Sequence, residues 1–523
     1  MPVQRPLQRT DQLKSLLVGV EPIQAGNALL ENFDVPVSGL ELDSRQVKNG
    51  NVFVALQGET VHGLSFVREA VAAGAIAVLY ESAGSEKLIS SLVEELAADD
   101  VAVPLFEVVD LSDHLGEIAS KFYGAPSKSI FVIGITGTNG KTSCSHFLAQ
   151  ALSSHGSQSD ACGVIGTLGY GAYGDLKSGQ YTTPDALKLH SLLATFSADE
   201  RSNVVMEVSS HALEQGRVGG VAFDMAVFTN LSHDHLDYHG DFFSYAQAKR
   251  RLFQMPGLRY AVVNCDDEFG RELLESLPEN LTTLGYGVFE AGFKREQLPD
   301  VYGKIVAMNE CGVEVNVMTP MGEGVLRSSL LGRFNVSNLL AVLAVMLLMK
   351  MPLKLALQRL SETKTVAGRM ERFGGGEILP LVVVDFAHTP DALLQVLQTL
   401  RSHCLGNLWC VFGCGGDRDR SKRSEMGAIA ERCAEQVIIT DDNPRHEDAR
   451  KIIEDIIAGM TSPDAVQVLP DRAEAIEYAV THAVSGDVVL IAGKGHEEYQ
   501  LVGDEKLQFS DRNYVNEVLK EVA

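Results

Sequence analysis

The chain has 523 residues, of which 45% are hydrophobic and 22% charged, and its formal net charge is −25. This length exceeds what one hydrophobic core usually serves, so several domains are expected. The acidic balance is not offset by any dense Lys/Arg block, which argues against nucleic acid and anionic membranes as partners. An anionic substrate then needs local cations or main-chain N–H groups.

Cysteine usage and the N-terminal segment predict the compartment. The eight cysteines are scattered singly, without CxxC spacing, which is typical of a reducing environment. The opening MPVQRPLQRTDQLKSLLVGV lacks the apolar stretch and cleavage site of a signal peptide, and no apolar run reaches membrane-spanning length. We therefore expect a cytoplasmic protein that does not bind membranes.

Short apolar runs alternate with longer helical patterns along most of the chain. NVFVAL at 51–56 precedes SFVREAVAAGA at 65–75, and SIFVIGIT at 129–136 precedes TSCSHFLAQALSSHG at 142–156. This alternation predicts an α/β fold with mostly parallel sheets covered by helices. Breaks near GAPSKS and KTVAGRMERFGGG predict three domains, at 1–124, 125–367 and 368–523. The sequence contains no internal repeat, so a solenoid is not expected.

A glycine loop follows the strand-like SIFVIGIT and precedes a helical pattern, the order that a phosphate cradle requires. Glycines let successive N–H groups point at one anion, and the helix adds its positive N-terminal end. Ile135 stands where the longer Walker pattern has glycine, so this is the shorter GxxGKT form. The alternative is a glycine turn with a surface lysine. The expected ATP contacts here are Thr136, Gly137, Thr138, Asn139, Gly140, Lys141 and Thr142.

Further segments follow this loop in a fixed order. They are TTPDAL at 182–187, MEVSSHAL at 206–213, FTNLSHDHLDYHG at 228–240, YAQAKRRLF at 245–253, VVNCDDEFG at 262–270, GRFNVSNLLAVLA at 332–344, GRMERF at 368–373, DFAHTPDAL at 385–393, FGCGGDRDRSKR at 412–423, DDNPRHED at 441–448 and AGKGHEEYQ at 492–500. Together they resemble the Mur ligases over nearly the whole chain. DNPR and GKGHEEYQ resemble the subgroup of this family that adds diaminopimelate.

The resemblance implies three α/β domains: an N-terminal domain that binds the UDP-linked substrate, a central P-loop ATPase domain with a mostly parallel sheet, and a Rossmann-like C-terminal domain that binds the amino acid. It implies ATP-dependent addition of meso-diaminopimelate to UDP-N-acetylmuramoyl-L-alanyl-D-glutamate during peptidoglycan synthesis. Forming an amide from a carboxylate is uphill in water, so transfer of the γ-phosphoryl group of ATP must first give an acyl phosphate. The expected partners are these small molecules, and a monomer is expected.

The residues that the resemblance implies in catalysis are Lys141, Glu207, His235 and Lys249. Lys141 is expected on the β/γ-phosphates, while Thr142 and Glu207 hold one Mg²⁺ and Glu207 and His235 help to hold another. Spacing alone favours a solvated Lys249, but the resemblance implies that CO₂ converts it to a carbamate that binds the second Mg²⁺. The three histidines of HDHLDYH would otherwise suggest zinc, yet no cysteine or HExxH spacing supports it.

The resemblance also implies two sets of substrate contacts. Val61 stands where the family commonly has aspartate, and Phe386 replaces its commonest tyrosine, with packing expected to survive. The contacts with the muramoyl-dipeptide substrate are Leu42, Ser44, Thr182, Thr183, Ser209, Gln215 and Arg217. Additional ATP contacts are Asn335, Asn338, Asp385 and His388.

The amine pocket is the most discriminating part of the sequence. Diaminopimelate carries one carboxylate more than lysine, and the guanidinium of Arg445 is a planar bidentate donor for it. Taken alone, Asn-Pro could be a turn that leaves Arg445 solvated. The residues that the resemblance places in this pocket are Arg418, Asp442, Asn443, Pro444, Arg445, Gly493 and Glu497, with Glu497 on the distal ammonium.

Other functions remain to be weighed. Folylpolyglutamate synthase and a lysine-adding ligase share the general pattern. The UDP-like opening LELDSRQVKNG and the DNPR tetrapeptide count against the folate enzyme, and Arg445 counts against the lysine enzyme. A P-loop switch or motor would turn over nucleotide without a carboxylate or amine substrate. A non-catalytic binding protein would not need the combination of Lys141, Thr142, Glu207 and Lys249.

Overall fold

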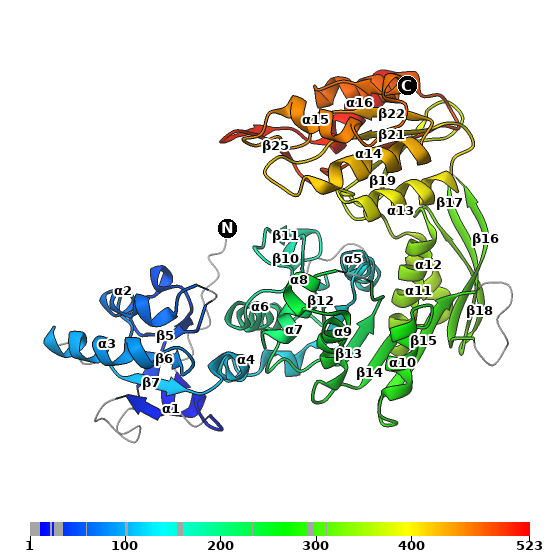
Figure 1. Ribbon diagram of the computed structural model, residues 1–523. Helices are drawn as coiled ribbons and strands as arrows, with labels where there is room; N and C mark the ends of the chain where they lie inside the picture. Colours follow the sequence, from blue (N-terminus) through cyan, green and yellow to red (C-terminus); the bar gives the residue numbers. More distant parts are fainter. Residues whose placement is uncertain are drawn as a thin grey trace. The chain divides into compact units, whose positions relative to one another are not determined.

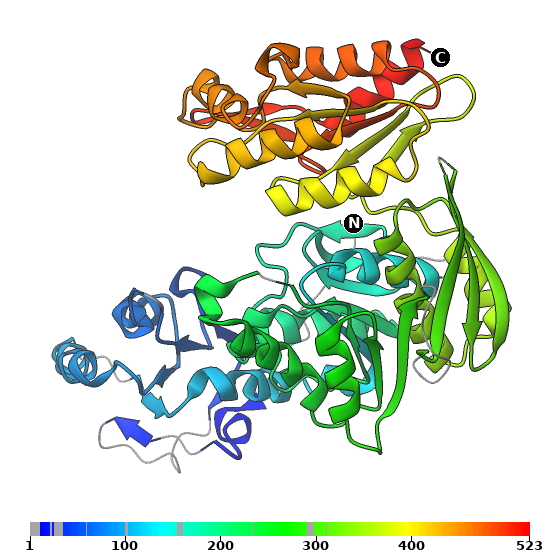
Figure 2. The ribbon, with the colours of Figure 1, turned by 45° about the vertical axis from the view of Figure 1, so that its right-hand side comes forward.

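The computed structural model describes residues 11–20, 23–25, 35–58, 60–99, 103–153, 161–232, 234–289, 298–309 and 311–522. The chain forms two compact units. The first contains 1–141, 152–261 and 272–283, and the second contains 142–151, 262–271 and 284–523. Figures 1 and 2 show the ribbon coloured along the chain. Four elements cross the boundary in sequence: α5 (Lys141–Leu152), β14 (Tyr260–Asn264), α10 (Glu268–Ser276) and β15 (Thr282–Val288).

The first unit begins with a five-stranded sheet of order β2-β7-β6-β5-β4, in which only β2 is antiparallel to its neighbour. Alternate strand residues face opposite layers, so α1 and α4 cover one face and α2 and α3 the other. The elements are β1 (Asp11–Gln12), α1 (Leu13–Leu16), β2 (Ile23–Ala25), β3 (Pro36–Val37), β4 (Gly39–Glu41), β5 (Asn51–Ala55), α2 (Val67–Ala72), β6 (Ala77–Glu81), α3 (Glu86–Ala98), β7 (Leu105–Val108) and α4 (Leu111–Phe122).

The same unit continues with strands in the order β11-β10-β9-β12-β8-β13, where β9, β12, β8 and β13 are parallel. Parallel strands end at one edge, so the residues that follow β8, β12 and β13 gather there. The elements are β8 (Phe131–Thr136), β9 (Gly163–Gly166), β10 (Gly169–Ala172), β11 (Asp175–Lys177), α6 (Ala186–Ala198), β12 (Asn203–Glu207), α7 (Ser210–Glu214), β13 (Met225–Phe228), α8 (Leu236–His239) and α9 (Phe242–Arg250).

The second unit contains a strand group that is mostly antiparallel. β15 (Thr282–Val288) pairs parallel with β16 (Val301–Asn309), and β17 (Gly312–Thr319) and β18 (Gly322–Ser328) continue in antiparallel order. Helix α11 (Arg333–Leu348) packs on β16, and α12 (Leu353–Ser361) packs on β18. The apolar run LLAVLAVMLL makes α11 hydrophobic on all sides, and its residues 335–336 and 338–347 are buried.

The rest of this unit is a six-stranded sheet of order β19-β20-β24-β21-β22-β23, parallel except for β19. Helices α13 to α15 cover one face and α16 and α17 the other, which is a doubly wound arrangement (Figure 1). The elements are β19 (Glu371–Gly374), β20 (Leu381–Asp385), α13 (Pro390–Arg401), β21 (Leu408–Phe412), α14 (Ser421–Cys433), β22 (Gln436–Ile439), α15 (Ala449–Ile457), β23 (Gln467–Val468), α16 (Arg472–His482), β24 (Val488–Ala492), β25 (Tyr499–Val502), β26 (Glu505–Gln508) and α17 (Asp511–Val522).

The α/β fold with largely parallel sheets is therefore as the sequence predicts. The strongest deviation is the antiparallel group β16 to β18, whose residues alternate between the face under α11 and α12 and an open face. Among the described helices, none combines the length and the apolar content needed to cross a membrane. The predicted bounds of the three domains stay predictions.

Candidate active site

The phosphate loop lies between the end of β8 and the start of α5. Gly137 and Gly140 have φ of 148° and 84°, a region that glycine adopts without strain. A Cβ atom on Gly137 would come within 1.9 Å of Thr229 Oγ1. Lys141 Nζ donates to the main-chain oxygens of Gly137 and Thr138, each at 2.8 Å. The lysine thus curls back over its own loop.

The loop after β13 holds this phosphate loop in place. Thr138 N donates to Asn230 O at 2.8 Å, and Asn139 N donates to Asn230 Oδ1 at 2.9 Å. Thr229 Oγ1 in turn donates to Asn139 O at 2.6 Å. Neither Thr229 nor Asn230 was singled out in the sequence, although both lie in the FTNLSHDHLDYHG segment.

Lys249 is buried against the same loop, with 1% of its surface exposed. Its Nζ donates to Gly137 O at 2.9 Å and lies 4.3 Å from the ring centroid of Tyr245. Burial, reinforced by the charge of Lys141, holds the pKa of Lys249 well below its usual range. The solvated lysine that spacing alone favours is therefore wrong. A buried amine with a depressed pKa is available in its neutral, nucleophilic form.

Glu207 ends β12 and is fully buried. Its Oε1 accepts from Thr167 N at 2.9 Å and its Oε2 from Thr167 Oγ1 at 3.1 Å. Thr182 Oγ1 lies 3.0 Å from the same threonine hydroxyl, and Thr183 Oγ1 donates to Glu207 O at 2.8 Å. Glu207 and Thr182 are thus joined through Thr167, which the sequence analysis missed, whereas Thr183 bonds directly to Glu207.

The cluster extends toward the residues predicted for the muramoyl-dipeptide substrate. Ser209 N donates to Thr183 Oγ1 at 3.0 Å, and the Ser209 hydroxyl caps α7. Arg217 Nη1 donates to Thr183 O at 3.2 Å, and its guanidinium lies 5.2 Å from the Tyr181 ring centroid. Hydroxyls, a guanidinium and a carboxylate are therefore collected at the ends of β9 and β12.

His235 lies in a separate aromatic group. Its φ is 54°, its side chain is half exposed, and its ring is 4.8 Å from His211 and 6.3 Å from Tyr245. Within the described residues, no three His, Cys, Asp or Glu side chains are grouped as a metal site. His233 lies outside the described residues. His239, also left unassigned, contacts Ser210 Oγ through Nε2 at 3.0 Å.

The remaining residues predicted to bind the muramoyl-dipeptide substrate have partners within the protein. Ser44 is buried, and its hydroxyl donates to Glu69 Oε2 at 2.6 Å. Leu42 is half-buried after β4, and Gln215 Nε2 donates to Tyr238 OH at 2.9 Å. Val61 is exposed. This exposure suits a residue of a surface turn better than it suits an apolar replacement for an acid that faces a ligand.

The additional residues predicted for ATP also form internal contacts. Asn338 Nδ2 donates to Asn335 Oδ1 at 3.3 Å, both in the buried part of α11. The carboxylate of Asp385 accepts from Met370 N at 2.7 Å and Ala387 N at 2.8 Å, and burial raises its pKa. His388 Nδ1 contacts Phe386 O at 2.8 Å. Their contact with ATP stays a prediction.

Arg445 is fixed by its surroundings. Its φ is 50°, its N–H donates to Leu501 O at 3.0 Å, and its carbonyl accepts from Gly503 N at 2.7 Å. Its Nη1 donates to Gly416 O at 2.8 Å. The β25–β26 hairpin and the glycine loop after β21 therefore hold this residue between them, and a freely solvated Arg445 is excluded.

Three side chains close a hydrogen-bonded triangle beside Arg445. Asn443 Nδ2 donates to Glu497 Oε2 at 3.0 Å, and Lys494 Nζ donates to Asn443 Oδ1 at 3.0 Å and to Glu497 Oε2 at 3.2 Å. Leu501 N also donates to Asn443 Oδ1, at 2.9 Å. The sequence predicts Asn443 and Glu497 in this pocket but does not single out Lys494.

The other predicted pocket residues line the same region. Asp442 is buried, and burial raises its pKa against the opposing charges of Arg472 and Lys494. Gly493 has φ of 117°, and a Cβ atom there would lie 2.5 Å from Asp442 Oδ2. Pro444 is buried between Asn443 and Arg445, whereas Arg418 is exposed on the glycine loop.

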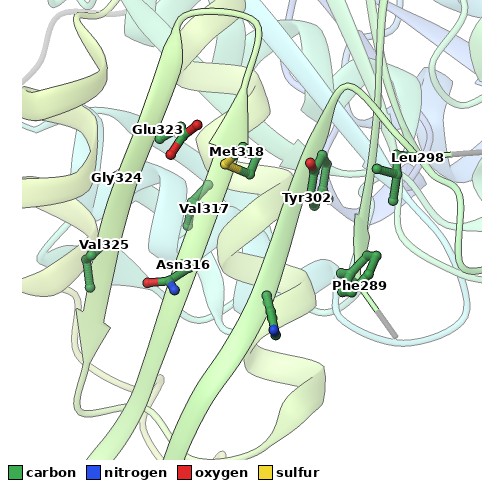
Figure 3. A pocket seen from close by; sticks show the side chains of 10 residues that line it. Phe289, Leu298, Tyr302, Asn316, Val317, Met318, Glu323, Gly324 and Val325 are labelled. Atoms are coloured by element: carbon green, nitrogen blue, oxygen red, sulfur yellow. The ribbon is translucent and has the colours of Figure 1, made fainter. Parts of the chain in front are cut away.

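A cavity of about 710 Å³ lies elsewhere, on the open face of β16 to β18 (Figure 3). Its lining includes Phe289, Tyr302, Asn316, Met318 and Glu323. It shares no residue with the predicted site. Its size therefore does not bear on the chemistry of the two clusters described above.

Comparison with known proteins covers nearly the whole chain. The Mur ligase family catalytic domain matches residues 36–123, the Mur ligase middle domain matches 135–346, and the Mur ligase glutamate ligase domain matches 368–495. The UDP-N-acetylmuramoyl-L-alanyl-D-glutamate--2,6-diaminopimelate ligases of Coxiella burnetii and Pseudomonas aeruginosa are each 48% identical, over 91% of this chain and 94% of theirs. A solved structure of a ligase with that name is 35% identical, with a TM-score of 0.71 over 98% of this chain and 99% of its own.

Proposed function

Because the chain belongs to the Mur ligase family, we propose that it uses ATP to join meso-diaminopimelate to UDP-N-acetylmuramoyl-L-alanyl-D-glutamate in peptidoglycan synthesis. The relatives at 46–48% identity carry the name of this ligase. Family membership argues against a P-loop switch or a non-catalytic binding protein. The sequence of the pocket around Arg445 argues against the folate and lysine ligases.

The observation that carries the choice of amine is the fixation of Arg445. A guanidinium held by Gly416 O and by the hairpin is already ordered, so little side-chain entropy remains to be lost when a carboxylate binds. Lysine has no carboxylate at its distal carbon and would leave this guanidinium unpaired, which a desolvated site penalises. Glu497 offers the opposite charge for the distal ammonium.

The first chemical step requires the carboxylate of the dipeptide to attack the γ-phosphorus of ATP. Lys141 and the positive N-terminal end of α5 compensate charge on the phosphate oxygens. The products are an acyl phosphate and ADP. The residues around Glu207 and Thr183 would orient the dipeptide, because their hydroxyls and Arg217 suit its polar groups.

In the second step, the amine of diaminopimelate attacks the acyl carbon and inorganic phosphate leaves. Ordering both substrates turns this into an effectively unimolecular reaction. The pocket around Arg445 and Glu497 supplies the orientation, because it holds the far end of the amine substrate.

Mg²⁺ fits the donor groups that are present. Thr142 offers a hydroxyl and Glu207 a carboxylate, and hard oxygen ligands are what Mg²⁺ prefers. Both oxygens of Glu207 lie against Thr167, which donates one hydrogen bond to each of them. When bound, the ion neutralises charge that develops on the transferred phosphoryl group. We keep Thr142, Glu207 and His235 as the proposed ligands.

The carbamate of Lys249 belongs to the same proposal. The support is the YAQAKRRLF segment together with the burial of this lysine against Gly137. Addition of CO₂ to a neutral amine gives a carbamate and releases one proton, so a neutral group becomes an anion with two oxygen donors. That change would place a hard ligand beside the phosphate loop.

The test measures phosphate release with ATP, Mg²⁺, UDP-N-acetylmuramoyl-L-alanyl-D-glutamate and a panel of amino acids, with mass spectrometry of the product. We expect release that depends on both substrates and a product heavier by one diaminopimelate residue. Release without an amine, or a clear preference for lysine, would contradict the proposal. The substrates are cytoplasmic metabolites, and we propose that the enzyme acts there as a monomer, which light scattering can check.

A further inference from the structure

Lys494 is a buried charge that the proposed reaction does not yet use. It belongs to the segment AGKGHEEYQ, directly after Gly493, and its side chain has no exposed surface. A fully buried lysine is costly unless it is paired and hydrogen-bonded. Its partners, Asn443 and Glu497, are two residues of the proposed amine pocket.

The hydrogen bonds fix the orientation of the Asn443 amide. Its Oδ1 accepts from both Lys494 Nζ and Leu501 N, so its NH₂ group must face Glu497. Without a donor at Lys494, the amide could rotate and exchange oxygen for nitrogen. The lysine therefore determines which polar group Asn443 presents.

The same lysine fixes Glu497. Oε2 of this carboxylate accepts from Lys494 Nζ and Asn443 Nδ2, whereas Oε1 accepts no hydrogen bond within the described part of the chain. The side chain is 21% exposed, so one oxygen faces the accessible side of the pocket. A carboxylate held at one oxygen and open at the other is suited to receive an ammonium.

The charges of the pocket are also balanced by Lys494. Asp442 and Glu497 are the acids near it, and the charge of Lys494 opposes that of Asp442. The other buried cation nearby, Arg472, is committed to the fully buried Asp511 at 2.7 and 2.8 Å. Lys494 is therefore the buried cation that directly contacts Glu497 in this triangle.

We infer that Lys494 is a positioning residue for the amine substrate, which holds Glu497 and Asn443 in the orientation that receives the distal ammonium of diaminopimelate. It acts through these two side chains and does not itself contact the reacting atoms. This inference rests on the proposed function, because it assigns a role within that amine pocket.

The test compares Lys494→Met with Lys506→Met, both in the full-length protein. Methionine keeps an unbranched side chain as far as the ε position and suits a buried site, but it removes the charge and the donor. Lys506 is the matched control: it is exposed, and its Nζ lies 3.9 Å from the Tyr499 ring, which Lys494 approaches to 5.8 Å. Steady-state phosphate release gives KM for each substrate separately.

For Lys494→Met we expect kcat/KM for diaminopimelate to fall about 10²-fold, since displacement of about 1 Å can cost that much. KM for ATP and for the UDP-linked substrate should stay within about twofold of the wild type, because neither contacts this triangle. Lys506→Met should match the wild type in all three constants. A uniform loss across the three substrates would indicate a merely structural role and overturn the inference.

A double-mutant cycle with Glu497→Gln separates positioning from folding. If Lys494 acts through Glu497, Lys494→Met should add little to the loss already caused by Glu497→Gln, because the group that it orients has changed. Additive losses would overturn the inference. If Lys494→Met does not fold, as judged by its thermal melt, Lys494→Gln takes its place in the cycle, since the amide can still donate to Asn443.

Failure of the proposed function would look different. It would show in the wild type, as no ligation of diaminopimelate at all. Normal ligation by the wild type together with a normal KM for diaminopimelate in a folded Lys494 variant would overturn only the role of Lys494.

Discussion

The phosphate loop and the amine pocket both depend on buried or partly buried lysines, but they use them differently. Lys141 and Lys249 donate to the main-chain oxygens of Gly137 and Thr138, which carry no net charge. Lys494 donates to the carboxylate of Glu497 and to an amide. The partners of these lysines therefore indicate their roles. A lysine beside main-chain carbonyls keeps its charge or its reactivity for a ligand, whereas a lysine beside a carboxylate fixes the orientation of that carboxylate.

The strongest test of the amine side of this comparison is substrate discrimination. We expect wild-type kcat/KM for meso-diaminopimelate to exceed that for L-lysine by roughly 10⁴-fold, because a desolvated Arg445 rejects the analogue that lacks its partner. Arg445→Ala should reduce diaminopimelate use far more than residual lysine use. Equal losses on both substrates in the steady-state assay would remove Arg445 from its role.

The next test concerns the phosphate loop. Lys141→Ala should lower kcat by about 10³-fold, because loss of one donor aimed at developing charge has that order of effect. Its side chain is only partly buried and contacts its own loop, so the circular dichroism spectrum and melting temperature should stay close to the wild type. A folded variant with near-native ligation would contradict the proposed role.

A smaller and reversible effect is expected at Lys249. Lys249→Ala should lose about 10²-fold in kcat, as expected when one group that stabilises charge is lost. Added acetate or another short carboxylate should restore part of the activity by replacing the carbamate oxygens. Activity is measured in bicarbonate-free buffer with and without the carboxylate. Full activity of the variant without any carboxylate would show that no carbamate is needed.

The smallest effect is expected at His446, at the rim of the amine pocket. His446 bridges Asp504 and Asp417, each at 3.1 Å, and these hydrogen bonds raise its pKa above the ordinary 6.5. Because the pKa of His446 is higher in the folded state, its protonation stabilises the folded protein. This contribution is fully present below the ordinary pKa and is lost as the pH rises through the raised pKa. The difference in melting temperature between wild type and His446→Ala should therefore be small, because the pair is exposed, and larger at pH 6 than at pH 9.

A melting difference at His446 that grows toward alkaline pH would contradict this assignment. Arg445 contacts the β25–β26 hairpin through a hydrogen bond from its own N–H to Leu501 O, and the side chain of His446 takes no part in this bond. The substrate preference should therefore survive in His446→Ala, which separates this rim contact from the pocket itself.

The two regions also differ in how far the sequence predicts them. The phosphate loop is local, so Gly137 to Thr142 can be read from one strand, one turn and one helix. The amine pocket is assembled from DNPR, the glycine loop and GKGHEEYQ, which are separated by tens of residues. Motif resemblance identifies Arg445 and Glu497 there, but their mutual geometry depends on tertiary packing.

Burial is the property that the sequence hides best. Lys249 lies beside Arg250 and Arg251 and looks solvated, yet it packs against Gly137. Lys494 lies between two glycines and gives no periodic signal, yet it is fully enclosed. Thr167 could have been sought, because it follows β9 at the edge where the parallel strands end.

Gly493 has a consequence for inhibitor design and resistance. Its φ of 117° disfavours any side chain, and a Cβ atom would lie 2.5 Å from Asp442 Oδ2. An inhibitor that packs against this glycine would contact a wall that mutation cannot readily reshape, since even alanine would strain the backbone and displace Asp442. Escape by substitution at this position would therefore damage the pocket itself.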